Sequence, residues 1–375
     1  MNCNSIRQSN FELMRIISMF FIVLWHVILN GNLLSNTVDV TNFTFYLIMF
    51  IIVFHVNSFL LLTGYFQVDS KFKLSKLISL LFQLVFYNLI INITLYKFGL
   101  VEYTNVEFIK SILFYNTSSY WFVSCYIILY CLSPFLNKLI HSLDKLEFKN
   151  NIIVLLLFFS VLPIVTNKLF LYHNGLGIIQ FILMYFLGAY IKKTEIDKRL
   201  FKNFNIIQKR ILLLIMFSLC VIFNLSLFYL QKQMNGLNSN ILVDISSGIN
   251  LFLFNYSNPI IIIQSIAVFV FFSTLNIKNK LINYISSLTL GVYLLHDNYN
   301  LRVNLFKWIG IDKESIIYGK RIILYTLFCA FIIFILGLIV ESIRNTIVKL
   351  LRKNIFIKKV DNKMLLFIEK IININ

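Results

Sequence analysis

Apolar residues dominate the chain in long segments that are separated by short polar stretches. Ten of these segments approach or exceed the length of a membrane-spanning helix, since about 20 apolar residues cross roughly 30 Å of hydrocarbon. They cover residues 11–30, 42–66, 77–96, 120–140, 151–167, 175–191, 210–230, 258–275, 283–300 and 320–343. The pattern therefore predicts an all-α integral membrane protein with about ten transmembrane helices.

The distribution of positive charge predicts how these helices are oriented. With the N-terminus in the cytoplasm, 25 of the 34 lysines and arginines fall on the cytoplasmic side and nine fall outside. Cytoplasmic loops are enriched in Lys and Arg, so we expect both termini to be cytoplasmic. Residues 1–345 then form one polytopic membrane domain, and residues 346–375 form a basic tail on the cytoplasmic leaflet.

The composition supports this class and excludes others. Hydrophobic residues make up 59% of the 375 positions, charged residues make up 13%, and the mean hydropathy is +0.80. The net charge of +18 follows from membrane topology, and no nucleic-acid motif accompanies it. The five cysteines include no C-x-x-C pair, so we expect neither a disulfide nor a metal site.

The first apolar segment contains three ionisable residues: Glu12, Arg15 and His26. Arg15 and His26 are eleven residues apart, so they share a helix face and differ in depth by about 16 Å. Ionisable residues at membrane depth are costly and usually functional, so this face predicts a polar path through the membrane. Each residue has an alternative role. Glu12 could form a capping box with Ser9, and Arg15 could extend only to the lipid headgroups. His26 could make a structural hydrogen bond between helices.

The spacing Glu12-x-x-Arg15, followed by ten residues and His26, resembles the signature of the membrane acyltransferase 3 family. Its members are integral membrane enzymes that move acyl groups, usually acetyl from acetyl-CoA, onto sugar hydroxyls of surface polysaccharides. The resemblance implies that His26 is the catalytic residue, either as a general base or as an acyl carrier. It also implies that Glu12 and Arg15 belong to the donor site.

The second segment ends in Thr63-Gly64-Tyr65, which is similar to the Ser-Gly-Tyr that closes a phenylalanine-rich run in the family. Thr63 stands where Ser is usual and keeps the hydroxyl. We expect Gly64 to allow a close backbone approach and Thr63 to bond back to its own helix. The alternative for Gly64 is a helix C-cap.

The fourth segment follows the pattern WF-x3-Y-x3-Y-x2-SPF-x-N over residues 121–137. This pattern resembles the branch of the family found in polysaccharide loci. Tyr126 and Tyr130 are four residues apart and share a helix face, so their hydroxyls are predicted to line a cavity and bind substrate.

The ninth segment contains Gly291-Val-Tyr293-Leu-Leu-His296, which resembles the family's Gly-Ile-Tyr-Leu-x-His stretch. Its predicted direction brings His296 and Asp297 to a depth comparable to that of His26. We expect His296 to take part in the site, and a structural hydrogen bond is the alternative. Adjacent helical residues point about 100° apart, so the sequence predicts no dyad of His296 with Asp297.

Three lysines, Lys71, Lys73 and Lys76, precede the third segment on the predicted cytoplasmic side. Coenzyme A carries several phosphate charges, so a basic rim suits its head group. We expect these lysines to bind the donor, although ordinary cytoplasmic lysines give the same pattern.

The resemblance implies an O-acetyltransferase that uses acetyl-CoA as a donor substrate and holds no tightly bound cofactor or metal. The implied acceptor is a hydroxyl of a capsule or O-antigen polysaccharide, or of its lipid-linked precursor. The expected location is the bacterial inner membrane, with lipids rather than nucleic acid as partners. The alternative is a glycan or lipid-linked sugar flippase or export component, but the chain has three prolines and no repeat typical of transporters.

Overall fold

Each of the ten predicted segments contains a helix in the computed structural model. The structure describes residues 7–37, 39–112, 120–163, 175–234, 249, 252–311 and 321–353, and these form helices and no strand. The helices are α1 Ser9–Asn30, α2 Leu33–Asn36, α3 Asp39–Ile52, α4 His55–Gln67, α5 Leu74–Lys97, α6 Asn105–Ile112, α7 Trp121–Ser142, α8 Lys145–Leu156, the π-helical η1 Leu157–Val161, α10 Ile178–Thr194, α11 Ile196–Leu200, α12 Ile206–Met234, α14 Pro259–Ser273, α15 Lys280–His296, α16 Tyr299–Ile309 and α18 Ile322–Lys353.

The all-α membrane class is confirmed, whereas the count of ten spans is not. Within the described residues, six helical stretches are long and apolar enough to cross a membrane: Ser9–Asn30, Val40–Gln67, Leu74–Lys97, Trp121–Ser142, Ile206–Met234 and Ile322–Leu351. The helices α10, α14 and α15 have 17, 15 and 17 residues and are shorter. The cytoplasmic location of the termini stays a prediction, and residues 354–375 of the predicted tail lie outside the described residues.

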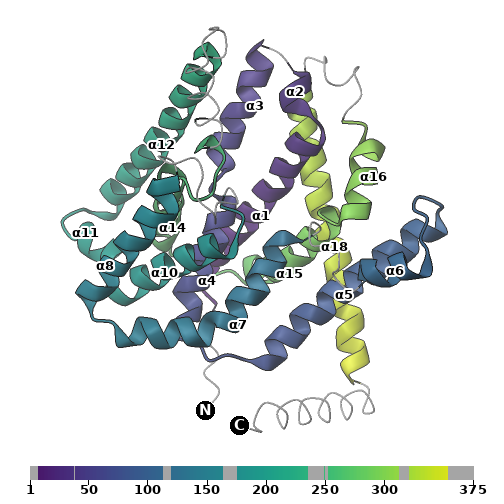
Figure 1. Ribbon diagram of the computed structural model, residues 1–375, viewed down its shortest axis with the longest axis horizontal. Helices are drawn as coiled ribbons and strands as arrows, with labels where there is room; N and C mark the ends of the chain where they lie inside the picture. Colours follow the sequence, from purple (N-terminus) through teal and green to yellow (C-terminus); the bar gives the residue numbers. More distant parts are fainter. Residues whose placement is uncertain are drawn as a thin grey trace.

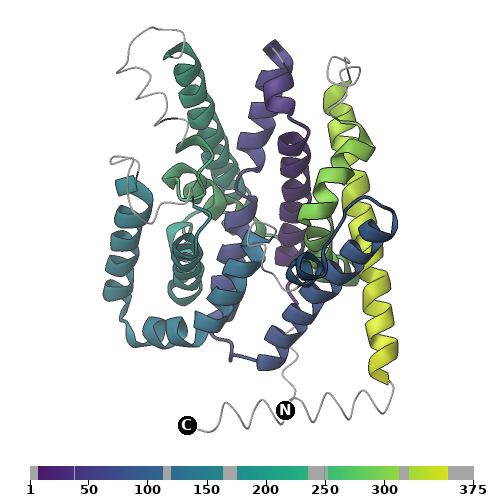
Figure 2. The same ribbon diagram turned by 45° about the vertical axis from the view of Figure 1, so that its right-hand side comes forward.

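Helix α1 lies in the interior of the bundle, between α3, α4 and α14 on one side and α15 and α18 on the other (Figures 1 and 2). It is largely apolar apart from the face of Arg15 and His26, as expected for a helix that other helices surround. Met14, Val23, Val27 and Ile28 are completely buried. We call the end where α1 and α5 begin, at the bottom of Figure 1, the basal end.

Helices α4 and α10 touch through their backbones. A Cβ atom on Gly64 would lie 2.1 Å from the Tyr185 carbonyl oxygen, and one on Gly188 would lie 2.2 Å from the Leu61 carbonyl oxygen. The predicted close approach at Gly64 is therefore confirmed. The C-cap alternative is wrong, because α4 continues to Gln67. Small residues at such crossings are typical of helix packing in membranes.

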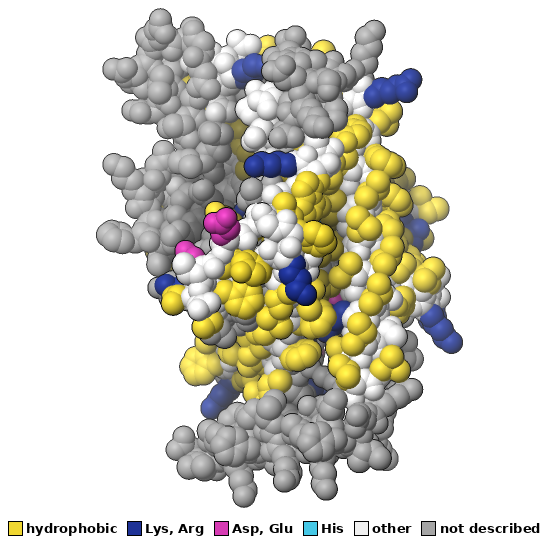
Figure 3. Space-filling model, turned by 90° about the vertical axis from the view of Figure 1, so that its right-hand side faces the viewer, with side chains coloured by type: hydrophobic (Ala, Val, Ile, Leu, Met, Phe, Trp, Pro, Cys, Tyr) yellow, Lys and Arg dark blue, Asp and Glu magenta, His cyan; other side chains and the backbone are white. Residues whose placement is uncertain are grey.

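Hydrophobic side chains cover most of the described part of the face that α18, α5 and α6 present (Figure 3). On α18 the exposed apolar residues are Leu324, Phe328, Phe331, Ile332, Leu336, Ile339, Val340, Ile343, Ile347, Leu350 and Leu351. An apolar surface of this extent suits contact with lipid, since water-facing surfaces rarely expose one.

Candidate active site

The basal end of α1 is tied to α15 by a buried carboxylate. Glu12 accepts a hydrogen bond from Arg15 Nη1 at 2.6 Å, and a second one from the Ser286 hydroxyl. Helix α1 begins at Ser9 and has Gln8 as its N-cap residue, with no side-chain cap bond. The capping-box interpretation is therefore wrong, and Glu12 instead fixes the guanidinium of Arg15.

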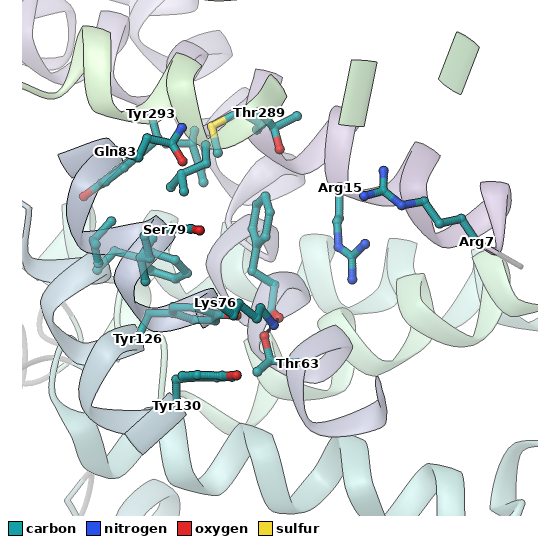
Figure 4. Close-up of a pocket in the computed structure, with 17 residues that line it drawn as sticks. Arg7, Arg15, Thr63, Lys76, Ser79, Gln83, Tyr126, Tyr130, Thr289 and Tyr293 are labelled. Atoms are coloured by element: carbon teal, nitrogen blue, oxygen red, sulfur yellow. Dashed lines mark hydrogen bonds between the residues drawn. The ribbon is translucent and has the colours of Figure 1, made fainter. Parts of the chain in front are cut away.

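A cavity of about 480 Å³ opens between α1, α5, α7 and α15, within the range of small-molecule sites (Figure 4). It is lined by Arg7, Arg15, Met19, Ile22, Phe59, Thr63, Lys76, Ser79, Leu80, Gln83, Phe122, Val123, Tyr126, Tyr130, Thr289, Leu290 and Tyr293. Arg7, Arg15 and Lys76 are the cations among these residues. Arg15 and Lys76 come from the basal ends of α1 and α5, and Arg7 lies two residues before α1. The cavity therefore has a basic basal part.

Both predicted tyrosines of α7 line this cavity. The Tyr130 hydroxyl accepts from the Lys73 backbone N–H at 3.0 Å and donates to the Lys73 carbonyl at 3.1 Å. The ammonium of Lys76 lies 4.9 Å from the centre of the Tyr130 ring, a cation–π contact. All three lysines are exposed, but Lys76 lines the cavity, whereas Lys71 and Lys73 do not.

The inner part of the cavity ends one helical turn from a pair of histidines. Ile22 and Tyr293 line it, and they precede His26 and His296 by about one turn. His26 Nδ1 and His296 Nε2 lie 2.9 Å apart, which confirms that the two histidines have comparable depth. The His26 side chain remains 17% exposed, so its ring is not sealed off.

The hydrogen bonds of this pair define which nitrogens carry protons. His296 Nδ1 lies 2.7 Å from the Val292 carbonyl oxygen, which can only accept, so Nδ1 is the protonated nitrogen of a neutral His296. His296 Nε2 then has a lone pair, and His26 Nδ1 must donate to it. The remaining nitrogen, His26 Nε2, is left with a lone pair that can accept a proton or an acyl group.

Asp297 lies beside His26. Its Oδ1 lies 3.8 Å from His26 Nδ1 and accepts a hydrogen bond from Arg302 Nη1 at 2.8 Å. The Asp297 side chain is 3% exposed, so its charge acts in a poorly screened environment. A positive charge that forms on His26 is attracted by Asp297, and the Arg302 guanidinium, which pairs with the same carboxylate, offsets part of this attraction.

A polar network holds the distal end of α15 in place. The Tyr120 hydroxyl donates to the Leu294 carbonyl at 2.6 Å. The side-chain amide of Asn298 donates to the Tyr120 hydroxyl at 3.0 Å and to Asn88 Oδ1 at 3.1 Å. These bonds join α5, α7 and α15 beside the histidine pair, which restricts the position of His296.

A family model described as an acyltransferase domain matches residues 8–341. The chain belongs to the acyltransferase 3 family. Searches among curated proteins and among solved structures found no match. The match covers most of the chain and includes α1, the cavity and both histidines, so the protein is a membrane acyltransferase of this family.

Sequence reasoning missed several residues of this acyltransferase site. Arg302 was not predicted, and its only signal is a basic residue five positions after Asp297. Glu341 and Arg344 were also missed, although an acidic and a basic residue three apart in an apolar segment are unusual enough to indicate a buried pair. Among the residues that the structure covers, no group of three or more His, Cys, Asp or Glu side chains is arranged to hold a metal ion.

Proposed function

We propose that this acyltransferase transfers an acetyl group from cytoplasmic acetyl-CoA to a hydroxyl of a surface polysaccharide or its lipid-linked precursor. The observation that carries the proposal is a single cavity that connects a cluster of cations to the surroundings of His26. The phosphates of acetyl-CoA need cations to bind them, and the acceptor hydroxyl, a weak nucleophile, needs a base to take its proton. The cations line the basal part of the cavity, and its inner part ends about one helical turn from His26.

The basal part of the cavity suits the phosphorylated end of the donor. Arg7, Arg15 and Lys76 offer charged donors there, and Glu12 holds Arg15 in one orientation. Lys71 and Lys73 are exposed nearby in the chain and attract an anionic donor towards this end. The pantetheine arm then extends past Tyr126 and Tyr130 along the largely apolar wall.

The reaction uses the lone pair of His26 Nε2. The acceptor hydroxyl gives its proton to Nε2 as its oxygen bonds to the thioester carbonyl carbon. The C–S bond breaks, and the thiolate of coenzyme A takes the proton back from the imidazolium. His296 accepts the hydrogen bond of His26 Nδ1–H and so keeps the lone pair of His26 on its Nε2. Asp297 stabilises the His26 imidazolium while it exists.

A relay through His26 uses the same nitrogen and remains the alternative mechanism. Nε2 attacks the thioester carbonyl, the C–S bond breaks, and coenzyme A leaves as the thiolate. The acceptor oxygen then attacks the acyl carbon, the bond from that carbon to Nε2 breaks, and the hydroxyl proton passes to the thiolate. A pulse of radiolabelled acetyl-CoA without acceptor separates the two mechanisms. Label trapped on the protein and lost in His26→Ala favours the relay, and an unlabelled protein favours the general base.

Proteoliposomes test the function itself. The purified protein receives radiolabelled acetyl-CoA on the side of the basal end and a lipid-linked oligosaccharide as acceptor. We expect label on the oligosaccharide, and none when the donor is confined to the opposite side. Movement of the oligosaccharide across the membrane without labelling would instead support a flippase.

A further inference from the structure

Glu341 and Arg344 form an ion pair inside the bundle that the mechanism above does not use. Arg344 Nη2 and Nε donate to the two carboxylate oxygens of Glu341 at 2.6 and 2.8 Å. The side chains of Glu341 and Arg344 are only 2% and 9% exposed. Burying two charges in an apolar helix is costly, so a role beyond simple packing is expected.

The same carboxylate also binds α5. The Tyr87 hydroxyl donates to Glu341 Oε2 at 2.8 Å, and the Gln83 side-chain amide donates to Oε1 at 3.1 Å. Each carboxylate oxygen thus accepts two hydrogen bonds, one from Arg344 and one from α5. Glu341 therefore joins two helices that are more than 250 residues apart in the sequence.

Gln83 belongs to the face of α5 that forms the cavity wall. Lys76, Ser79 and Gln83 line the cavity and lie on successive turns of one helix face, as Figure 4 shows. The position of this face decides how wide the cavity is. It also decides how far the ammonium of Lys76 lies from the guanidinium of Arg15.

The basal half of α5 has little packing to hold it. The buried residues of α5 are Leu84, Tyr87, Asn88, Ile91, Asn92 and Leu95, all in the half that follows Gln83. Between Leu74 and Gln83 no side chain is buried. Its position therefore depends on polar contacts at its two ends, from Lys73 to Tyr130 and from Gln83 and Tyr87 to Glu341.

We propose that Glu341 is a positioning residue that holds the basal half of α5 and thereby sets the geometry of the donor cavity. Arg344 holds the carboxylate in one orientation, and Tyr87 and Gln83 transmit its position to α5. The effect on acetyl-CoA rests on the proposed function, whereas the effect on α5 does not. Two measurements separate these parts.

The first measurement is kinetic. Tyr87→Phe removes one link between α5 and Glu341 and leaves the ion pair intact. We expect the KM for acetyl-CoA to rise roughly three- to tenfold with kcat within about twofold, because the lost bond to a charged group aligns the donor site only. Glu341→Gln combined with Arg344→Gln, which leaves no unpaired charge, should raise KM further.

Tyr284→Phe is the matched control. The Tyr284 hydroxyl is hydrogen-bonded to Ser342 of α18 at 2.7 Å, but it comes from α15 rather than α5. This variant loses an exposed hydrogen bond to the same helix and leaves the links of α5 intact, so its KM should equal that of the unmodified protein. An equal rise of KM in both tyrosine variants would show general destabilisation of α18 and overturn the proposal.

The second measurement needs no donor. Ser79→Cys, in a chain whose native cysteines are replaced by alanine, reports the exposure of the cavity wall through its rate of maleimide labelling. We expect faster labelling when Tyr87→Phe is added and no change when Tyr284→Phe is added. Unchanged labelling together with an unchanged KM overturns the proposal. Faster labelling in a protein that does not use acetyl-CoA supports the role of Glu341 in holding α5, but it refutes acetyl-CoA as the donor substrate.

Discussion

The histidine pair and the Glu341–Arg344 pair both bury ionisable side chains against α15 or α5, yet their hydrogen bonds differ in one respect. The chain from Val292 through His296 to His26 ends at a nitrogen, His26 Nε2, with a free lone pair. The carboxylate of Glu341 instead accepts four hydrogen bonds, two on each oxygen. An atom with a free lone pair can react, whereas a saturated group can only hold its neighbours in place.

The largest expected effect comes from His26→Gln. Glutamine retains hydrogen bonding but has no basic nitrogen, so kcat should fall by roughly 10³-fold or more. Radiolabel transfer in proteoliposomes measures this, and donor binding by the purified variant serves as the folding control. Near-normal turnover would show that His26 has only a structural role, as we propose for Glu341.

A pair of variants at His296 tests the assignment of protons. His296→Leu removes the acceptor for His26 Nδ1–H, so the lone pair is no longer fixed on Nε2 and kcat should fall roughly 10²-fold. His296→Gln supplies an amide oxygen in a similar position and should recover most of this loss. Equal activity of the two variants contradicts the assigned tautomer, and turnover at saturating donor is the measurement.

Asp297→Asn tests the charge beside His26. At about 4 Å a unit charge contributes on the order of 4 kcal/mol in a partly screened site, but Arg302 offsets part of this. We therefore expect kcat to fall roughly tenfold while the KM for the donor stays the same. An additional Arg302→Gln substitution removes the unpaired cation, and full recovery of kcat in that double variant would show that Asp297 serves only to neutralise Arg302.

The smallest effect on kcat is expected at the basal end of the cavity. Arg15→Ala should raise the KM for acetyl-CoA about five- to twentyfold and leave kcat nearly unchanged, because a phosphate contact binds ground state and transition state alike. Lys71→Ala is the matched control, since Lys71 is exposed and does not line the cavity. Equal KM values for the Arg15 and Lys71 variants would remove Arg15 from the donor site.

Local periodicity explains what was predictable. Helical segments and the shared face of Arg15 with His26 depend only on residues close in the chain, as does the pairing of Tyr126 with Tyr130 on one face. The resemblance to the acyltransferase 3 family was carried by the same local spacings, and the family match over residues 8–341 confirms it. The number of helices that cross the membrane was not fixed by hydropathy, because helices such as α14 are apolar but short.

The sequence by itself determined an all-α membrane protein with an ionisable face on its first helix. Only the tertiary structure decided which groups meet that face, because helix packing, and not spacing along the chain, sets contacts between distant residues. His296 reaches His26 across 270 residues, and Asp297 turns towards His26 because it lies just past the end of α15. Among the three lysines only Lys76 reaches the cavity, since it lies within α5 on the face towards α7, whereas Lys71 and Lys73 precede the helix.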